Sequence, residues 1–340
     1  MTNLNEILTS LGAALRPFVT LARLVVLVPA IAAASYLLRR DKAATTDNGS
    51  ATLEPAWTAS DALWRSQHPD VELSVVIPFY NPGDSMRPTV DRLVDALRAE
   101  GVGFEVICVS DGSTDGSERS LDGAGHEVRV IVNLVNRGKG AALHTGFSHA
   151  LGRYVGMVDC DGDIDPVHLV DYVRRAQQHG AHIVYADKRL AESTSASSPF
   201  RKLVSLGFSS FVGTLFALGV QDTQTGCKLF SRHAMATVLP RLREERFAFD
   251  LEFFVAAKAA GIGGMMPAPV HLSERLSGST VTSKTILRTL GDALKVLGRL
   301  HLTRTYRDGL AHHVPTLAPV GIPAQRAGIP LPTAEVALAA

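Results

Sequence analysis

Short apolar runs alternate with amphipathic stretches between residues 71 and 186, and this alternation limits the fold more than any other feature of the chain. The strand-like runs lie at 71–79, 104–109, 128–132, 154–158 and 183–186, with helix-like stretches at 86–100 and 138–151. Strands that alternate with helices form a mainly parallel sheet with helices packed on it. We therefore expect a layered α/β fold in which the loops after the first, second and fourth strand meet at one edge.

Composition excludes several classes of protein. The chain has 340 residues, enough for one large catalytic domain with appendages, and its formal net charge of +1 gives no overall bias towards nucleic acid. Its three cysteines, Cys108, Cys160 and Cys227, are an odd number and lie far apart. This spacing predicts neither a disulfide framework nor a structural zinc site, and it favours a reducing compartment.

The segment from Phe18 to Leu38 has about the length of apolar sequence that crosses a bilayer, interrupted by Arg23 and Pro29. Basic residues at 39, 40 and 42 follow it directly, so we expect a membrane anchor with everything downstream in the cytoplasm. A cleaved signal peptide is the main alternative, and a helix in a soluble core is a weaker one.

The other end of the chain contains a second amphipathic stretch. Between Ile286 and Tyr306, leucines recur at helical spacing with basic residues between them. This pattern fits a helix at a membrane surface and fits a helix packed on the domain equally well. The expected organisation is an anchor at 1–40, a linker at 41–70, a catalytic domain at 71–282, an amphipathic or interfacial helix at 283–308 and a disordered tail at 309–340.

Two loops at the predicted sheet edge carry groups suited to a nucleotide. After the first strand, Pro78-Phe79-Tyr80-Asn81 turns an aromatic ring and an amide towards the expected crevice. After the second strand, the loop 110–117 combines small residues with Asp111 and Asp115, which suits contact with a base or ribose. Helix capping by Ser113 or Asp115 is an equally simple interpretation of that loop.

The third loop, Asn136-Arg137-Gly138-Lys139-Gly140, opens a helix, so it offers backbone amides, a helix N-terminus and two cations to an anion. The Walker spacing is absent, which argues against a nucleotide triphosphatase.

The fourth strand ends directly in Asp159-Cys160-Asp161. Two carboxylates this close repel each other unless a cation lies between them, and Mg²⁺ or Mn²⁺ with substrate phosphates is the expected occupant. An EF-hand is excluded because the glutamate that closes its loop is missing. A solvated acidic turn remains the simpler alternative.

Taken in order, these four motifs resemble an inverting family 2 glycosyltransferase with a GT-A fold. The segments 222–230 and 247–252 are similar to the dolichyl- or polyprenyl-phosphate glucose synthase branch. Two positions depart from the family pattern, since Pro82 replaces an acidic residue and Thr280 a lysine.

The resemblance implies roles for residues across this region. Arg275 with Gly278 is similar to the loop that handles phosphate in mannose synthases. The implied nucleotide-sugar site comprises Pro78, Tyr80, Asn81, Asp111, Ser113, Asn136, Gly138, Lys139, Asp159, Cys160 and Gln224. The implied catalytic residues are Asp161, Asp250, Lys228 and Arg275, and the implied metal ligands are Asp159 and Asp161.

The resulting expectation is metal-dependent transfer of a hexose from a nucleotide sugar to a polyprenyl or dolichyl phosphate, with UDP-glucose as donor and membrane lipid nearby. GDP-mannose, a UDP-N-acetylhexosamine or a hydroxyl acceptor are alternatives, and Asp250 or Glu252 would be the base for a hydroxyl. Both carboxylates equally fit charges at a helix N-terminus, the interpretation that we favour for Glu252. An inactive nucleotide-sugar-binding scaffold is the alternative from another class.

Overall fold

The computed structural model describes residues 71–193, 212–213, 215–220, 222–272, 283–303 and 305–306, with side chains from 288 onwards in the last helix. The predicted anchor, linker and tail, together with Arg275, Gly278 and Thr280, lie outside the described residues. Within the described residues, no helix combines the length and apolar character needed to cross a membrane.

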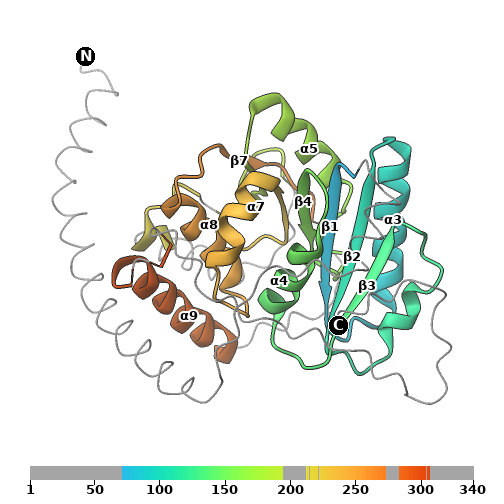
Figure 1. The fold of residues 1–340 in the computed structure, drawn as a ribbon, viewed down its shortest axis with the longest axis horizontal. Coiled ribbons are helices and arrows are strands. Elements are labelled where there is room, and N and C mark those ends of the chain that lie inside the picture. Colours follow the sequence, from blue (N-terminus) through green and yellow to red (C-terminus); the bar gives the residue numbers. More distant parts are fainter. Residues whose placement is uncertain are drawn as a thin grey trace.

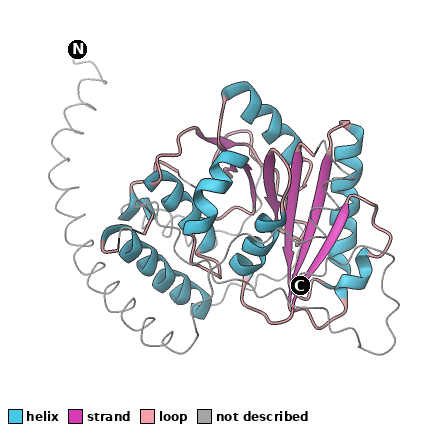
Figure 2. Ribbon diagram, viewed as in Figure 1, coloured by secondary structure: helices cyan, strands magenta, loops and turns pink. Residues whose placement is uncertain are grey.

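A seven-stranded sheet forms the centre of the described region, in the order β3-β2-β1-β4-β6-β5-β7 (Figures 1 and 2). Its strands are β1 (Leu73–Phe79), β2 (Phe104–Asp111), β3 (Val128–Asn133), β4 (Tyr154–Val158), β5 (Ile183–Ala186), β6 (Cys227–Ser231) and β7 (Met265–Ala268). The five strands predicted from the sequence are all present, and two of them have the predicted bounds. Every residue of β1 and β2 is buried, because helices cover both faces of the sheet.

The helices form two layers. The layer on one face contains α3 (Met86–Ala99) and α5 (His168–His179), and the layer on the other contains α4 (Lys139–His149), α7 (Arg232–Val238), α8 (Phe249–Ala259) and α9 (Ser283–His301). Three short 3₁₀ helices, η1 (Gly83–Ser85), η2 (Ser117–Leu121) and η3 (Leu239–Arg241), complete the described elements. Successive β1 side chains pack alternately against the two helix layers. Val75 and Ile77 pack with α3, whereas Val76 packs with α4.

Strand β6 runs against its two neighbours. It pairs antiparallel with β4, where Cys227 lies opposite Val158, and antiparallel with β5. The other pairs in the sheet are parallel. An antiparallel strand begins at the edge where parallel strands end, so the residues just before Cys227 reach the carboxyl edge of β4. The expectation of a mainly parallel sheet is therefore confirmed, with one reversed strand.

Helix α9 packs on the domain through its described part, beside α8 in Figure 1. Ala293, Val296 and Leu297 are fully buried in the same cluster as the α8 side chains. Of the two alternatives that the leucine spacing left open, the structure shows the packed one for these residues. The helix belongs to the core of the domain, although the sequence placed a boundary at residue 283.

Candidate functional site

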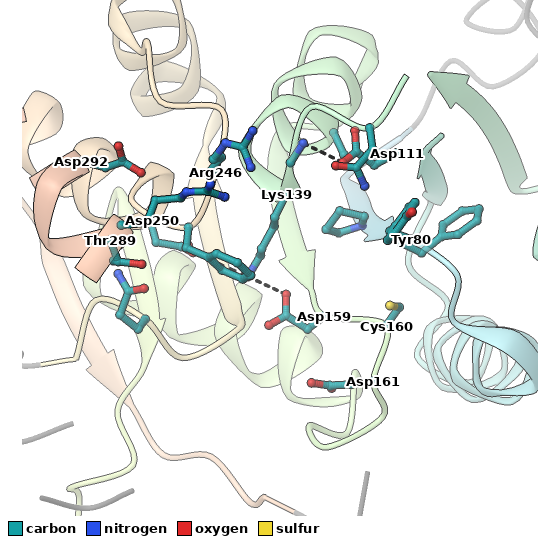
Figure 3. A pocket seen from close by; sticks show the side chains of 18 residues that line it. Tyr80, Asp111, Lys139, Asp159, Cys160, Asp161, Arg246, Asp250, Thr289 and Asp292 are labelled. Atoms are coloured by element: carbon teal, nitrogen blue, oxygen red, sulfur yellow. Dashed lines mark hydrogen bonds and ion pairs between the residues drawn. The ribbon is translucent and has the colours of Figure 1, made fainter. Parts of the chain in front are cut away.

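A cavity of about 760 Å³ opens at the carboxyl edge of the sheet. Figure 3 shows its wall, with Tyr80 and Asp111 on one side, Asp250, Thr289 and Asp292 on the other, and Asp159 to Asp161 below Lys139. The lining residues come from the ends of β1, β2 and β4, the start of α4, the segment before α8, and α9. They are Pro78, Phe79, Tyr80, Asp111, Asn136, Gly138, Lys139, Ala142, Asp159, Cys160, Asp161, Gln224, Arg246, Phe247, Asp250, Arg288, Thr289 and Asp292.

Both carboxylates of the predicted metal pair line this cavity. Asp159 follows β4 directly, and its backbone N–H donates to the carbonyl of Gly226 at 3.0 Å. A side chain at residue 226 has no room, since an ideal Cβ there would lie 1.9 Å from Asp159 Oδ2. Burial, and then the charge of Asp159, raise the pKa of Asp161 to about 6. A cation bound close to Asp161 would stabilise the ionised form of this carboxyl group.

Lys139 lies between the metal pair and α8. Its Nζ is 2.7 Å from Asp159 Oδ1 and 3.5 Å from Asp250 Oδ2. Burial alone would lower the pKa of Lys139, but the Asp159 and Asp250 carboxylates together raise it above its ordinary value. The sequence predicted that this lysine meets a substrate anion, whereas the structure gives it two carboxylate partners from the chain itself.

Asp250 is 4% exposed and is held by a second lysine. Lys228, which is 1% exposed, donates from Nζ to Asp250 Oδ1 at 2.7 Å and to the Thr225 carbonyl at 2.7 Å. Lys228 was expected near the sugar or acceptor, but it is absent from the cavity wall and reaches the site through Asp250. Each oxygen of Asp250 therefore has an ammonium group beside it.

Glu252 is remote from the cavity wall. Its Oε2 accepts hydrogen bonds from the backbone of Arg243 and Glu244, and its Oε1 accepts from Arg299 and Tyr306. The sequence favoured a helix N-terminal charge for Glu252. The structure also gives Glu252 a role in holding the domain together, because its bond to Arg299 joins α8 to α9.

Asp111, the last residue of β2, organises the side of the cavity that also holds Tyr80 (Figure 3). Its Oδ1 accepts from the backbone N–H of Arg137 at 3.1 Å and its Oδ2 from that of Gly138 at 2.7 Å. Burial raises the pKa of Asp111, while these two bonds act in the opposite direction. The sequence interpretation of free amides needs correction for Arg137 and Gly138, because the Asp111 carboxylate already accepts from both.

Asn81 and Ser113 are missing from the cavity wall and join the first two loops instead. Asn81 adopts a positive φ of 48°, its backbone N–H donates to Ser113 Oγ at 3.1 Å, and its Oδ1 accepts from the Thr114 backbone at 2.7 Å. Tyr80 is 51% exposed and lines the cavity. These contacts position Tyr80 at the rim, so Asn81 and Ser113 support the site from behind.

The two carboxylates suit a divalent metal that the substrate helps to bind. The described residues contain no group of three or more His, Cys, Asp or Glu side chains arranged to hold a metal by themselves. Mg²⁺ and Mn²⁺ are commonly bound through one or two carboxylates together with substrate phosphates. Asp159 and Asp161 at the cavity floor fit that pattern of oxygen donors.

Sequence comparison adds the family. The model of glycosyl transferase family 2 matches residues 74–239. The dolichyl-phosphate beta-glucosyltransferase of Mus musculus is 31% identical over 221 residues, which cover 60% of this chain and 68% of the mouse protein. The chain belongs to glycosyl transferase family 2. The dolichyl-phosphate beta-glucosyltransferase of Homo sapiens is 32% identical over 58% of this chain, and the match spans 65% of the human protein.

A solved structure supports the family 2 fold. Glucosyl-3-phosphoglycerate synthase from M. tuberculosis aligns with a TM-score of 0.50 at 16% sequence identity, over 72% of this chain and 85% of that chain. The alignment shows a shared fold of the GT-A type, as the sequence predicted. The identity is too low to carry any likeness of substrate.

Most of the predicted site residues gather in the cavity of this family 2 chain. Its wall contains Pro78, Tyr80, Asp111, Asn136, Gly138, Lys139, Asp159, Cys160, Asp161, Gln224 and Asp250. Arg275 lies outside the described residues.

Sequence reasoning missed the far wall, which Arg246, Phe247, Arg288, Thr289 and Asp292 contribute. One signal for α9 existed, because Arg288 and Asp292 are four residues apart and so share a helix face. For Phe247 the signal was its place at the start of the segment 247–252, which resembles the glucose synthase branch, and Arg246 comes directly before it.

Proposed function

We propose that this chain transfers a hexose, glucose from UDP-glucose as the first choice, to a polyprenyl or dolichyl phosphate with inversion at the anomeric carbon. The observation that carries the proposal is the state of Asp250. Its two oxygens lie 2.7 Å from Lys228 and 3.5 Å from Lys139, so the carboxylate best placed to act as a base is already ion-paired. That arrangement favours an acceptor that needs no base.

The donor would lie along the wall from Tyr80 to Asp161. Tyr80 and Asp111 would contact the nucleoside, and Asp159 with Asp161 would hold Mg²⁺ or Mn²⁺ at the diphosphate. The metal, when bound, supplies charge stabilisation for the leaving diphosphate. Glucose as the sugar is supported by the similarity to the mouse and human dolichyl-phosphate beta-glucosyltransferases.

Attack of the acceptor phosphate on the sugar needs no proton transfer. A phosphate monoester has a second pKa of about 6, so at neutral pH it is mostly a dianion whose oxygen can attack directly. A bond forms between this oxygen and the anomeric carbon as the bond from that carbon to the diphosphate breaks, and the electron pair leaves with UDP. Lys139, which contacts both Asp159 and Asp250, would hold these two carboxylates in place beside the sugar.

A membrane setting completes the proposal. The acceptor is a lipid, and the apolar segment from Phe18 to Leu38 is proposed as the anchor that keeps the catalytic domain at the cytoplasmic face. A hydroxyl acceptor is the second candidate function. In that reaction Asp250 would act as the base while it is paired with Lys139 and Lys228.

The test uses the full chain in detergent with radiolabelled UDP-glucose, GDP-mannose and UDP-N-acetylglucosamine, each offered to a polyprenyl phosphate or to the matching polyprenol. Labelled lipid formed from UDP-glucose and the phosphate, with none from the alcohol, is the expected result. Label on the alcohol would favour the second candidate, and no labelled lipid from any donor would refute both. Asp161→Asn should abolish transfer, whereas Asp122→Asn, at an exposed position outside the cavity wall, should leave it unchanged.

A further inference from the structure

Three side chains in the cavity wall have no part in the donor half of the proposed reaction. Arg246 and Phe247 precede α8, and Arg288 lies on α9. Both arginines are exposed, and the Phe247 ring is 51% exposed. Figure 3 places Arg246 beside Lys139, between Asp111 and Asp250. The same view places Thr289, the chain neighbour of Arg288, on the side of the cavity opposite Tyr80.

The lysine in the cavity wall and two lysines behind it are already paired with carboxylates. Lys139 contacts Asp159, buried Lys228 contacts Asp250, and Lys295 contacts the wall residue Asp292 at 3.3 Å. Arg246 and Arg288 differ, since neither has a carboxylate partner within the described part of the chain. A guanidinium group with its donors unused is well suited to bind a phosphate, often through two parallel hydrogen bonds.

The segment that carries Arg246 is fixed against α4. The backbone N–H of Ala141 donates to the Glu245 carbonyl at 2.9 Å, and the Arg137 side chain pairs with the Glu245 carboxylate. Gly140 permits this approach, since an ideal Cβ there would lie 2.7 Å from the Glu244 carbonyl oxygen. Arg246 and Phe247 are therefore placed beside the cavity before any substrate binds.

Helix α9 is anchored by a buried ion network. Arg299 Nη1 lies 2.6 Å from Glu244 Oε1 and 2.9 Å from Glu252 Oε1, and the Tyr306 hydroxyl donates to Glu252 Oε1 at 2.6 Å. Because Glu244 and Glu252 flank the segment with Arg246 and the start of α8, one network positions both parts of the far wall. Preorganised groups of this kind lose little entropy on binding.

We propose that Arg246 and Arg288 bind the phosphate of the lipid acceptor and that Phe247 packs on its first isoprene unit. This inference rests on the proposed function and adds the residues that select the acceptor. An exposed aromatic ring directly after a cation matches an amphiphile with an anionic head and an apolar chain. The phosphate would then approach the sugar from the Asp250 side, opposite the nucleoside wall.

The experiment uses citronellyl phosphate as a soluble acceptor and the full-length chain in detergent. Arg246→Ala and Arg288→Ala should each raise the acceptor KM about 10- to 100-fold, the range for losing a charge-assisted hydrogen bond. The KM for UDP-glucose should stay within about twofold, because the donor wall is untouched. Arg246→Lys should recover part of the loss, since the charge remains without the planar fork.

Matched controls come from outside the cavity. Arg119 is exposed and Leu302 is 46% exposed, and neither lines the wall, so Arg119→Ala and Leu302→Ala should behave as wild type. Phe247→Ala should weaken citronellyl phosphate while leaving the binding of inorganic phosphate unchanged. The two arginine variants should weaken both probes. Thermal unfolding of each variant checks that the domain remains folded.

Calorimetric binding of citronellyl phosphate separates this inference from the proposed function. If the wild-type chain binds citronellyl phosphate through both arginines yet transfers no glucose, the proposed acceptor site stands and the proposed activity is refuted. If the arginine variants are active and their acceptor KM is unchanged, the proposed acceptor site is refuted and the proposed activity stands. The same holds if their KM for UDP-glucose rises as much as their KM for the acceptor. A folded wild-type chain that neither binds nor transfers would overturn both.

Discussion

Replacing Gly226 by alanine should disable the site while leaving the fold intact. An ideal Cβ at residue 226 would lie 1.9 Å from Asp159 Oδ2 and 2.3 Å from Asp159 Cγ. Since the Asp159 carboxylate is the free end of a short side chain, it can swing away, and a shift of about 1.5 Å restores ordinary contact. That shift would take the carboxylate from its contact with Lys139 and from the proposed metal position.

The magnitude follows from this displacement. A misplacement of about 1 Å at a reacting centre costs on the order of 100-fold in rate, or about 2.7 kcal/mol of transition-state stabilisation. Stability should change little, because the φ of Gly226 lies outside the left-handed region and alanine fits its backbone. At such sites a Gly→Ala substitution stabilises the folded state by about 0.4–1 kcal/mol. Here the cost of displacing the Asp159 carboxylate offsets that gain.

The assay measures kcat/KM for UDP-glucose and the Mn²⁺ concentration that gives half-maximal rate, together with thermal unfolding. Gly263→Ala is the matched control, since a Cβ at Gly263 meets nothing within 4 Å. We expect Gly226→Ala to lose rate and to require more metal at an unchanged Tm. Wild-type rate and metal dependence in this variant would refute the reasoning, as would unfolding of the variant in place of a selective loss of activity.

Three further predictions test other parts of the structure. Asp161→Asn should abolish transfer at every Mn²⁺ concentration while its Tm stays at or above that of wild type, because the repulsion between the Asp161 and Asp159 carboxylates is removed; activity rescued by excess metal would contradict this. Arg299→Ala should lower the unfolding free energy by about 3–5 kcal/mol in urea titrations, since Glu244 and Glu252 are left as buried charges without their partner; a loss below about 1 kcal/mol would show that the network contributes little. Burial, and then Arg243, lower the pKa of His144 to about 4 from an ordinary 6.5, so its contribution to stability is full above pH 6.5 and is lost as the pH falls to 4. His144→Gln should therefore flatten the fall of Tm between those pH values, and parallel curves for the two proteins would exclude the effect.

Local patterns in the chain predicted much of this architecture. The strands at 154–158 and 183–186 were predicted with their observed bounds, because a short apolar run between turn residues needs no distant partner to be recognised. Parallel strands end at one edge, so the sequence also predicted that Asp111 and Asp159 share a cavity. The sequence did not predict which groups pair with these carboxylates.

The composition of the far wall depends on contacts between distant segments. Arg246 reaches the cavity because the Glu245 backbone bonds to α4, and Arg288 does so because Arg299 fixes α9 to α8. No spacing within either segment indicates such a contact. The same holds for Lys228, whose burial against Asp250 follows from the reversed direction of β6.

The sequence by itself determined the order of the first five strands, up to residue 186, and the placement of acidic residues at strand ends, because both follow from periodicities that act within about ten residues. The tertiary structure alone decided which of those charges remain available to a substrate. Lys139 and Asp250 carry opposite charges in the sequence and pair only when α4 and α8 meet at the cavity. Electrostatic pairing depends on distance in space, and folding sets that distance.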